Sequence, residues 1–111
     1  MKGVLLVNLG SPDTTETRDV RDYLDEFLMD ERVIDLPKWF RAFLVKGIIL
    51  KTRPKKSAKA YKKIWWNEGS PLIVLSKRLQ QKIRKKISPP LELAMRYGNP
   101  SIKQGMENLK H

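Results

Sequence analysis

The chain has 111 residues, 41% of them hydrophobic, and a formal net charge of +11. This length is enough for one small domain with a modest core. The sequence contains no cysteine, which excludes disulfides and thiolate metal sites, and no run approaches the roughly 20 apolar residues that span a bilayer. The first residues enter a strand-like run at once, unlike a secretion signal. We therefore expect a soluble, cytoplasmic protein.

The positive charge is concentrated in two stretches. No acidic residue occurs between Asp35 and Glu68, and a second basic group lies in residues 77–86. Such a surface attracts phosphates, acidic lipid headgroups or carboxylates, although a solvated helix face explains it equally well. The function that this charge supports by itself is a small basic module that binds an anionic membrane or nucleic acid. Helix-turn-helix, RNA-binding and zinc-finger signatures are absent, so we expect no nucleic-acid partner.

The chain opens with the pattern of a β-strand followed by a helix. Val4 to Val7 is an unbroken apolar run, typical of a strand buried on both faces in a parallel sheet, and it ends at Gly10-Ser11-Pro12. Asp13 and Glu16 have the spacing of a capping pair. The helix that follows is amphipathic, with apolar residues at Val20, Tyr23, Leu24, Phe27 and Leu28. We expect this helix to pack on the sheet.

A connector, residues 29–36, leads through Pro37 to a helix that is apolar on much of its circumference and basic on the rest. This pattern suits either a buried helix or one at a membrane surface or hydrophobic cleft, and burial is the commoner explanation. Under the second interpretation, Trp39, Phe40 and Phe43 make a peripheral contact with the inner face of the membrane.

Two more helices are expected before the second strand. Ser57 is a candidate N-cap for a short helix that ends near Trp65. Ser70 followed by Pro71 is a strong helix start, since it combines an N-cap serine with proline at the first helical position. The apolar positions of this helix recur at helical spacing: Leu72, Leu75, Leu79, Ile83 and Ile87.

The end of the chain repeats the strand–turn–helix order. Residues 91–97 alternate between apolar and more polar side chains, as in a strand, and Gly98-Asn99-Pro100 forms the turn. A last helix is expected to bury Ile102, Met106 and Leu109. The fold class predicted from this order is α/β, a partial doubly wound parallel sheet made of two βα units with extra helices.

The expected ligand edge is the carboxyl end of the two strands, at residues 8–12 and 96–100. No G-x-G-x-x-G follows Gly10, and metal-ligand spacings are absent. The one histidine, His111, stands at the end of the sequence, where a disordered tail is the usual explanation. We therefore expect no catalytic residue, no metal site and no cofactor in this chain.

Five short motifs occur in one order along the sequence. Residues 5–12 contain L-x-N-x-G-x-P, and residues 30–37 read D-x-x-V-I-x-L-P. R-P-K follows at residues 53–55, then Y-x-x-I from Tyr61 with S-P-L at residues 70–72, and finally M-R-Y-G at residues 95–98. Over essentially the whole chain, this series resembles the amino-terminal part of ferrochelatase, the enzyme family that inserts ferrous iron into a porphyrin in haem biosynthesis.

The resemblance implies porphyrin contacts for four residues. Arg53, Tyr61 and Ser70 would pair with propionate carboxylates at the rim of the ring, and Leu9 would touch the face of the macrocycle. The residues alone also allow a solvated charge at Arg53, a core tyrosine at Tyr61 and a simple helix cap at Ser70. Arg96 and Tyr97 are implied for the floor of the pocket.

The resemblance also implies a chelatase-like fold, with residues 1–111 as the amino-terminal porphyrin-binding domain of a longer, two-domain enzyme. The family's catalytic His and Glu lie in a following domain, so this chain by itself is expected to be inactive, and ferrous iron is a substrate of the full enzyme. The sequence differs from the family pattern in two places. Trp65–Gly69 is bulkier and longer than the usual glycine-rich stretch, and Thr52-Arg53 stands where many members have paired arginines.

Overall fold

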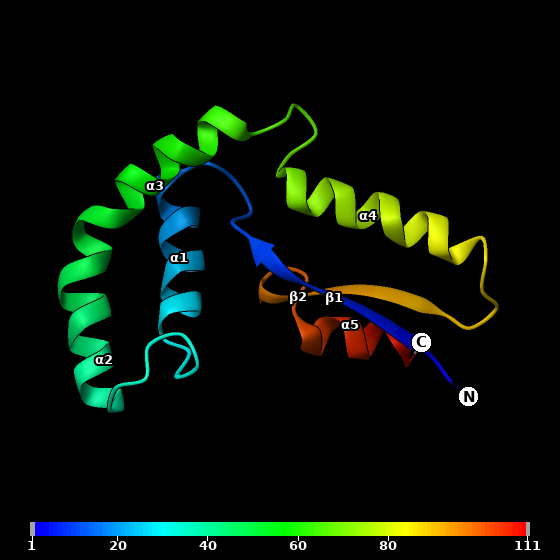
Figure 1. Ribbon diagram of the computed structural model, residues 1–111, viewed down its shortest axis with the longest axis horizontal. Helices are drawn as coiled ribbons and strands as arrows, with labels where there is room; N and C mark the ends of the chain where they lie inside the picture. Colours follow the sequence, from blue (N-terminus) through cyan, green and yellow to red (C-terminus); the bar gives the residue numbers. More distant parts are fainter. Residues whose placement is uncertain (1, 111) are drawn as a thin grey trace. The chain divides into compact units, whose positions relative to one another are not determined.

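The computed structural model describes residues 2–110, and these fall into two compact units. Residues 2–11 and 66–110 form the sheet unit, and residues 12–65 form the helical unit. The sheet unit contains β1 (Val4–Ser11), α4 (Pro71–Arg84), β2 (Leu91–Gly98) and α5 (Ile102–Leu109). The strands pair in parallel, with Val4 opposite Leu91 and Ser11 opposite Gly98, and both helices pack on them (Figure 1). The α/β class and the parallel pairing are confirmed.

The two strands differ in burial. In β2, Leu91, Leu93 and Met95 are buried, whereas Val4 and Val7 of β1 are exposed. The prediction that this first run is buried on both faces is therefore wrong. The sheet has two strands within residues 2–110, so β1 has a strand neighbour on one side only and its apolar side chains are incompletely covered.

A glycine closes the contact between the strand ends. Gly10 has a φ of +122°, a conformation that side chains rarely adopt, and it faces Tyr97 in the register. A Cβ atom on Gly10 would lie 1.9 Å from the carbonyl oxygen of Tyr97. Only a residue without a side chain lets the two backbones approach this closely.

α4 begins where the sequence predicts, with Ser70 as N-cap and Pro71 as its first residue. Its buried side is not the predicted apolar stripe, because Leu75 and Leu79 are 53% and 49% exposed while Ser76 and Gln80 are buried. The spacing of the leucines correctly predicted a helix, but it was wrong about which side of the helix is buried.

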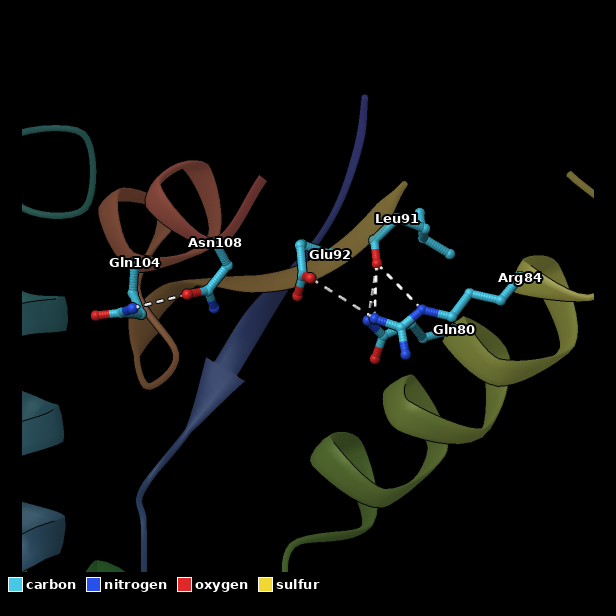
Figure 2. Close-up of polar contacts among 6 residues, drawn as sticks. All are labelled: Gln80, Arg84, Leu91, Glu92, Gln104 and Asn108. Carbon is cyan, nitrogen blue, oxygen red and sulfur yellow. Dashed lines mark hydrogen bonds and ion pairs between the residues drawn. The ribbon is translucent and has the colours of Figure 1, made fainter. Parts of the chain in front are cut away.

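Hydrogen bonds explain why polar side chains of α4 face the sheet. Figure 2 shows Gln80 and Arg84 converging on the carbonyl oxygen of Leu91 at the start of β2, with Gln80 Nε2 at 3.3 Å and Arg84 Nη2 at 2.8 Å. Arg84 also lies 3.8 Å from a carboxylate oxygen of Glu92. Both bonds satisfy one backbone acceptor at the edge of the sheet, where no neighbouring strand supplies a donor.

α5 approaches the opposite face of the sheet through Gly105. A Cβ atom there would lie 2.8 Å from Leu5 Cδ1 and 3.0 Å from Ala94 Cβ, so the helix sits too close for a side chain. The prediction that Met106 points inward is wrong, since it is exposed and the turn is rotated toward Gly105. Ser101 caps the helix by accepting from the backbone N–H of Gln104 at 3.1 Å.

The helical unit contains α1 (Thr17–Leu28), α2 (Lys38–Leu44), a π-helical turn η1 (Val45–Ile49) and α3 (Leu50–Ile64). α1 packs against α3 and η1, and its residues Val20 and Tyr23 are buried. Within this unit, α3 provides the apolar partner of α1.

The start of α1 also differs from the prediction. Glu16 is the N-cap and makes no capping bond through its side chain, so the Asp13–Glu16 capping pair is wrong. Thr14 instead closes a turn just before the helix, since its Oγ1 accepts from the Glu16 N–H at 3.0 Å and donates to Asp19 Oδ2 at 2.6 Å.

Helical structure continues without a break from Lys38 to Ile64, so the predicted start at Ser57 is wrong. A proline inside a helix, as Pro54 is in α3, lacks an N–H, and its ring crowds the carbonyl four residues earlier, here that of Leu50. In the structure Leu50 follows the π-turn and has a ψ of −5°, which opens the backbone at that point. The chain therefore passes through a buried Pro54 as α3.

Candidate porphyrin-binding site

The residues implied for porphyrin binding are divided between the two units. α3 of the helical unit carries two of them, and the sheet unit carries the other four. The first pair is Arg53 and Tyr61, and the second set is Leu9, Ser70, Arg96 and Tyr97.

Three of these residues meet at the carboxyl edge of the strands. Leu9 is exposed one position before Gly10, which faces the buried Tyr97. The guanidinium carbon of the exposed Arg96 lies 5.0 Å from the centre of the Tyr97 ring, a cation–π distance. The edge thus combines an apolar side chain with a cation, as binding an amphipathic ring with acidic substituents requires.

A polar relay ties this edge to the first turns of α4. The Leu9 N–H donates to Asn8 Oδ1 at 2.7 Å, and Asn8 Nδ2 donates to Ser76 Oγ at 3.1 Å. Ser76 in turn donates to the carbonyl oxygen of Leu72 at 2.7 Å. Leu9 and the start of α4, where Ser70 lies, are therefore held in one hydrogen-bonded frame. The sequence placed Asn8 at the expected ligand edge but gave Ser76 no role, although a polar residue on a helix that packs on the sheet was a usable signal.

Two serine hydroxyls near this frame are unusual. Ser70 is buried and stands at the N-cap of α4, yet its side chain makes no capping hydrogen bond within the described chain. Ser11, opposite Gly98, is also buried, and its Oγ has no hydrogen-bond partner among residues 2–110. A helix cap is the ordinary role of such a serine, and Ser70 does not fill it. The sequence placed Ser11 within the expected ligand edge, but nothing in the sequence signals an unsatisfied hydroxyl there.

On α3, Tyr61 is half-buried and meets Trp65 edge-on, with ring centres 6.0 Å apart. Burial raises the pKa of the Tyr61 phenol above its usual value of 10.0. The phenol therefore stays protonated at neutral pH and can donate a hydrogen bond. Arg53 is exposed on the same helix, about 12 Å earlier along its axis. The two side chains are spaced to bind different groups of one large ligand.

α2 exposes its aromatic side chains. Trp39 and Phe43, one helical turn apart, are 74% and 61% exposed, and Phe40 is partly exposed as well. Burial, the commoner expectation for this segment, is therefore wrong for these residues. Within residues 2–110 no helix has the length and apolar character to cross a bilayer.

Comparisons with known proteins place the chain. The family model of ferrochelatase matches residues 1–111. The chain is 60% identical over 107 residues to the ferrochelatase of Pseudomonas savastanoi pv. phaseolicola, and 58% identical over 107 residues to that of Azotobacter vinelandii. It belongs to the ferrochelatase family. Each match covers 96% of this chain and 31% of the relative, so the chain spans about a third of the length of these curated ferrochelatases.

Membership in the ferrochelatase family confirms the resemblance drawn from the five motifs. The structure locates Leu9, Arg96 and Tyr97 at the strand edge of the sheet unit, Ser70 at the start of α4, and Arg53 and Tyr61 on α3 of the helical unit. Within the residues described, no three His, Cys, Asp or Glu side chains gather into a metal-binding group. His111 lies outside the described residues.

Proposed function

We propose that this chain is the amino-terminal, porphyrin-binding domain of a longer ferrochelatase, which inserts ferrous iron into a porphyrin. The family match over residues 1–111, at 31% of the length of the relatives, supports it. Among the candidate residues, the observation that favours a ligand most directly is Ser70, whose buried hydroxyl does not cap its own helix. The residues that remove the pyrrole protons and handle the iron would then lie outside this chain.

In this proposal each residue has a distinct part. Arg53, protonated Tyr61 and Ser70 donate to the propionates, and charge-assisted bonds from Arg53 are the strongest of these. Leu9 covers one face of the macrocycle by apolar contact. Arg96, stacked on Tyr97, lines the floor. These contacts grip and orient the ring, and the full enzyme supplies the chemistry.

Replacement of Arg53 tests the binding role. In the complete enzyme, Arg53→Ala is expected to raise the Michaelis constant for porphyrin more than it lowers turnover, because a rim contact stabilises ground state and transition state alike. An exposed charge-assisted bond is worth on the order of 1 kcal/mol, or several-fold in affinity. Lys56→Ala, an exposed cation on the same helix, is the matched control. Unchanged porphyrin affinity in the Arg53 variant would return that residue to the solvated surface.

A second proposed role is peripheral contact of α2 with an anionic membrane, supported by the exposure of Trp39 and Phe43 and by the basic α3 that follows. Co-sedimentation with anionic liposomes is expected to fall with salt and to be lost in Trp39→Ala with Phe43→Ala. The control is Leu75→Ala with Leu79→Ala, which removes exposed apolar side chains from the sheet unit. Equal losses in both double variants would show that α2 is no specific anchor.

A further inference from the structure

The segment before α4 is a closed turn. The Trp66 N–H donates to the carbonyl oxygen of Gly69, and the Gly69 N–H donates back to that of Trp66, both at 3.0 Å. Gly69 has a φ of +126°, which suits glycine and lets the turn close. Asn67 and Glu68 form its exposed tip. This turn replaces the glycine-rich stretch that the family often has at this point. Because its side chains are bulky, the position of the turn affects the residues next to it.

One side chain of α4 holds this turn. Arg78, two turns into the helix, donates from Nη2 to Glu68 Oε2 at 2.9 Å. Its guanidinium carbon also lies 5.7 Å from the centre of the Trp66 ring, within cation–π range. The turn is therefore attached to the flank of α4 at two points, one ionic and one aromatic. Because the guanidinium is planar, it can serve both partners at once, which a lysine cannot do.

Ser70 is the residue between this turn and the helix. Its backbone is extended, with φ −60° and ψ 129°, and its carbonyl accepts the first bond of α4 from Val74 at 2.9 Å. Within the described chain no capping bond orients the Ser70 hydroxyl, so the backbone sets the direction of its Cα–Cβ bond, and the hydroxyl takes one of the staggered rotamers about that bond. That direction is fixed from one side by α4, anchored to β1 through Ser76 and Asn8, and from the other side by the clamped turn.

We infer that Arg78 is a positioning residue for Ser70: by clamping Glu68 and Trp66 against α4, it fixes the direction in which the Ser70 hydroxyl meets a porphyrin propionate. This inference rests on the proposed porphyrin-binding function. Arg78 touches no substrate group and acts only through the turn. Both members of the ion pair are exposed, so the expected effect on porphyrin affinity is moderate, about threefold.

The test is a double-mutant cycle in the complete enzyme, with protoporphyrin titrated by fluorescence quenching. Arg78→Ala and Ser70→Ala are each expected to weaken binding by about threefold. The double variant should bind as Ser70→Ala does, because Arg78 has nothing left to position. Glu68→Arg combined with Arg78→Glu is expected to restore most of the affinity. Lys82→Ala, which removes another exposed cation from α4, should leave affinity unchanged.

The outcomes separate this inference from the proposed function. If Ser70→Ala weakens binding and the Arg78→Ala loss is additive with it, the porphyrin site stands and the positioning role is overturned. Unchanged affinity in Arg78→Ala also overturns it. If Ser70→Ala itself has no effect, the proposed Ser70 contact fails, and the inference fails with it. Should Arg78→Ala fold poorly, Glu68→Gln removes the same ion pair at the exposed tip.

Discussion

The two units depart from the simple hydrophobic pattern in opposite directions. In the sheet unit, polar side chains are buried, and Ser76 and Gln80 hydrogen-bond to the strands. In the helical unit, large aromatic side chains such as Trp39 and Phe43 are exposed. Buried hydrogen bonds have strict geometry and fix where α4 lies, whereas exposed aromatic groups mark a surface that can bind something else. Directional hydrogen bonds therefore determine the packing of the sheet unit, whereas the helical unit presents an exposed apolar surface for binding.

The backbone approach at Gly10 gives the largest expected effect. Gly10→Ala would bring a Cβ atom to 1.9 Å from the Tyr97 carbonyl oxygen, so the strand ends must separate, at a cost of about 4 kcal/mol or more. Gly69→Ala is the control, since its φ is similarly positive but no atom lies within 4 Å of the place that a Cβ atom would take there. Its expected cost is the strain alone, about 1–3 kcal/mol. Urea unfolding of the full chain measures both, and equal losses would show that the close approach is unimportant.

Replacing a helical glycine with alanine is expected to change stability in opposite directions in the two units. Gly105→Ala places a methyl group 2.8 Å from Leu5 Cδ1 and 3.0 Å from Ala94, and overpacking of this kind costs about 1–3 kcal/mol. Gly47→Ala in η1 meets Phe43 at 3.8 Å, an ordinary contact. It should stabilise the helical unit by roughly 0.5–1 kcal/mol through helix propensity. The opposite signs are read from the urea midpoints, and a stabilising Gly105→Ala would contradict the close packing of α5.

The sequence predicted the sheet unit better than the helical unit. An unbroken apolar run predicted β1, alternation predicted β2, and the Ser70-Pro71 start predicted α4, because these are local signals of backbone conformation. The inner face of α4 was missed, since Ser76 and Gln80 are buried by bonds to residues distant in the chain. The helix start expected at Ser57 was wrong, because helical structure continues through a π-turn that has no sequence signature and on past Pro54. The candidate site residues were predicted from the motif resemblance, and the strand pattern by itself predicted only the ligand edge at the ends of the strands.

Removal of a sheet-facing hydroxyl should have a smaller effect. Ser76→Ala removes its bonds to Asn8 and to the Leu72 carbonyl, with an expected net loss of about 1 kcal/mol. Asn8→Ala should cost less in that background than alone, because the shared contact is already lost and only the bond from the Leu9 N–H is left to remove. Ser57→Ala in α3 is the counterpart in the helical unit, where higher helix propensity predicts a slight gain. Chemical denaturation decides between the two, and a neutral Ser76→Ala would remove the directional role assigned to the relay.

The smallest effect concerns Tyr61, the half-buried polar group of the helical unit. Its pKa is raised in the folded state by burial, so folding favours the protonated phenol. The resulting stabilisation is fully present below the unfolded pKa of about 10 and is lost as pH rises through the higher folded pKa. Tyr61→Phe should therefore show a shallower decline in unfolding free energy above pH ~10 than the parent chain, with a constant difference between them near neutrality. Because lysines also titrate in that range, the quantity to measure is the difference between variant and parent across the pH series. A difference that stays constant to high pH would place the Tyr61 phenol in solvent and contradict its burial in the folded chain.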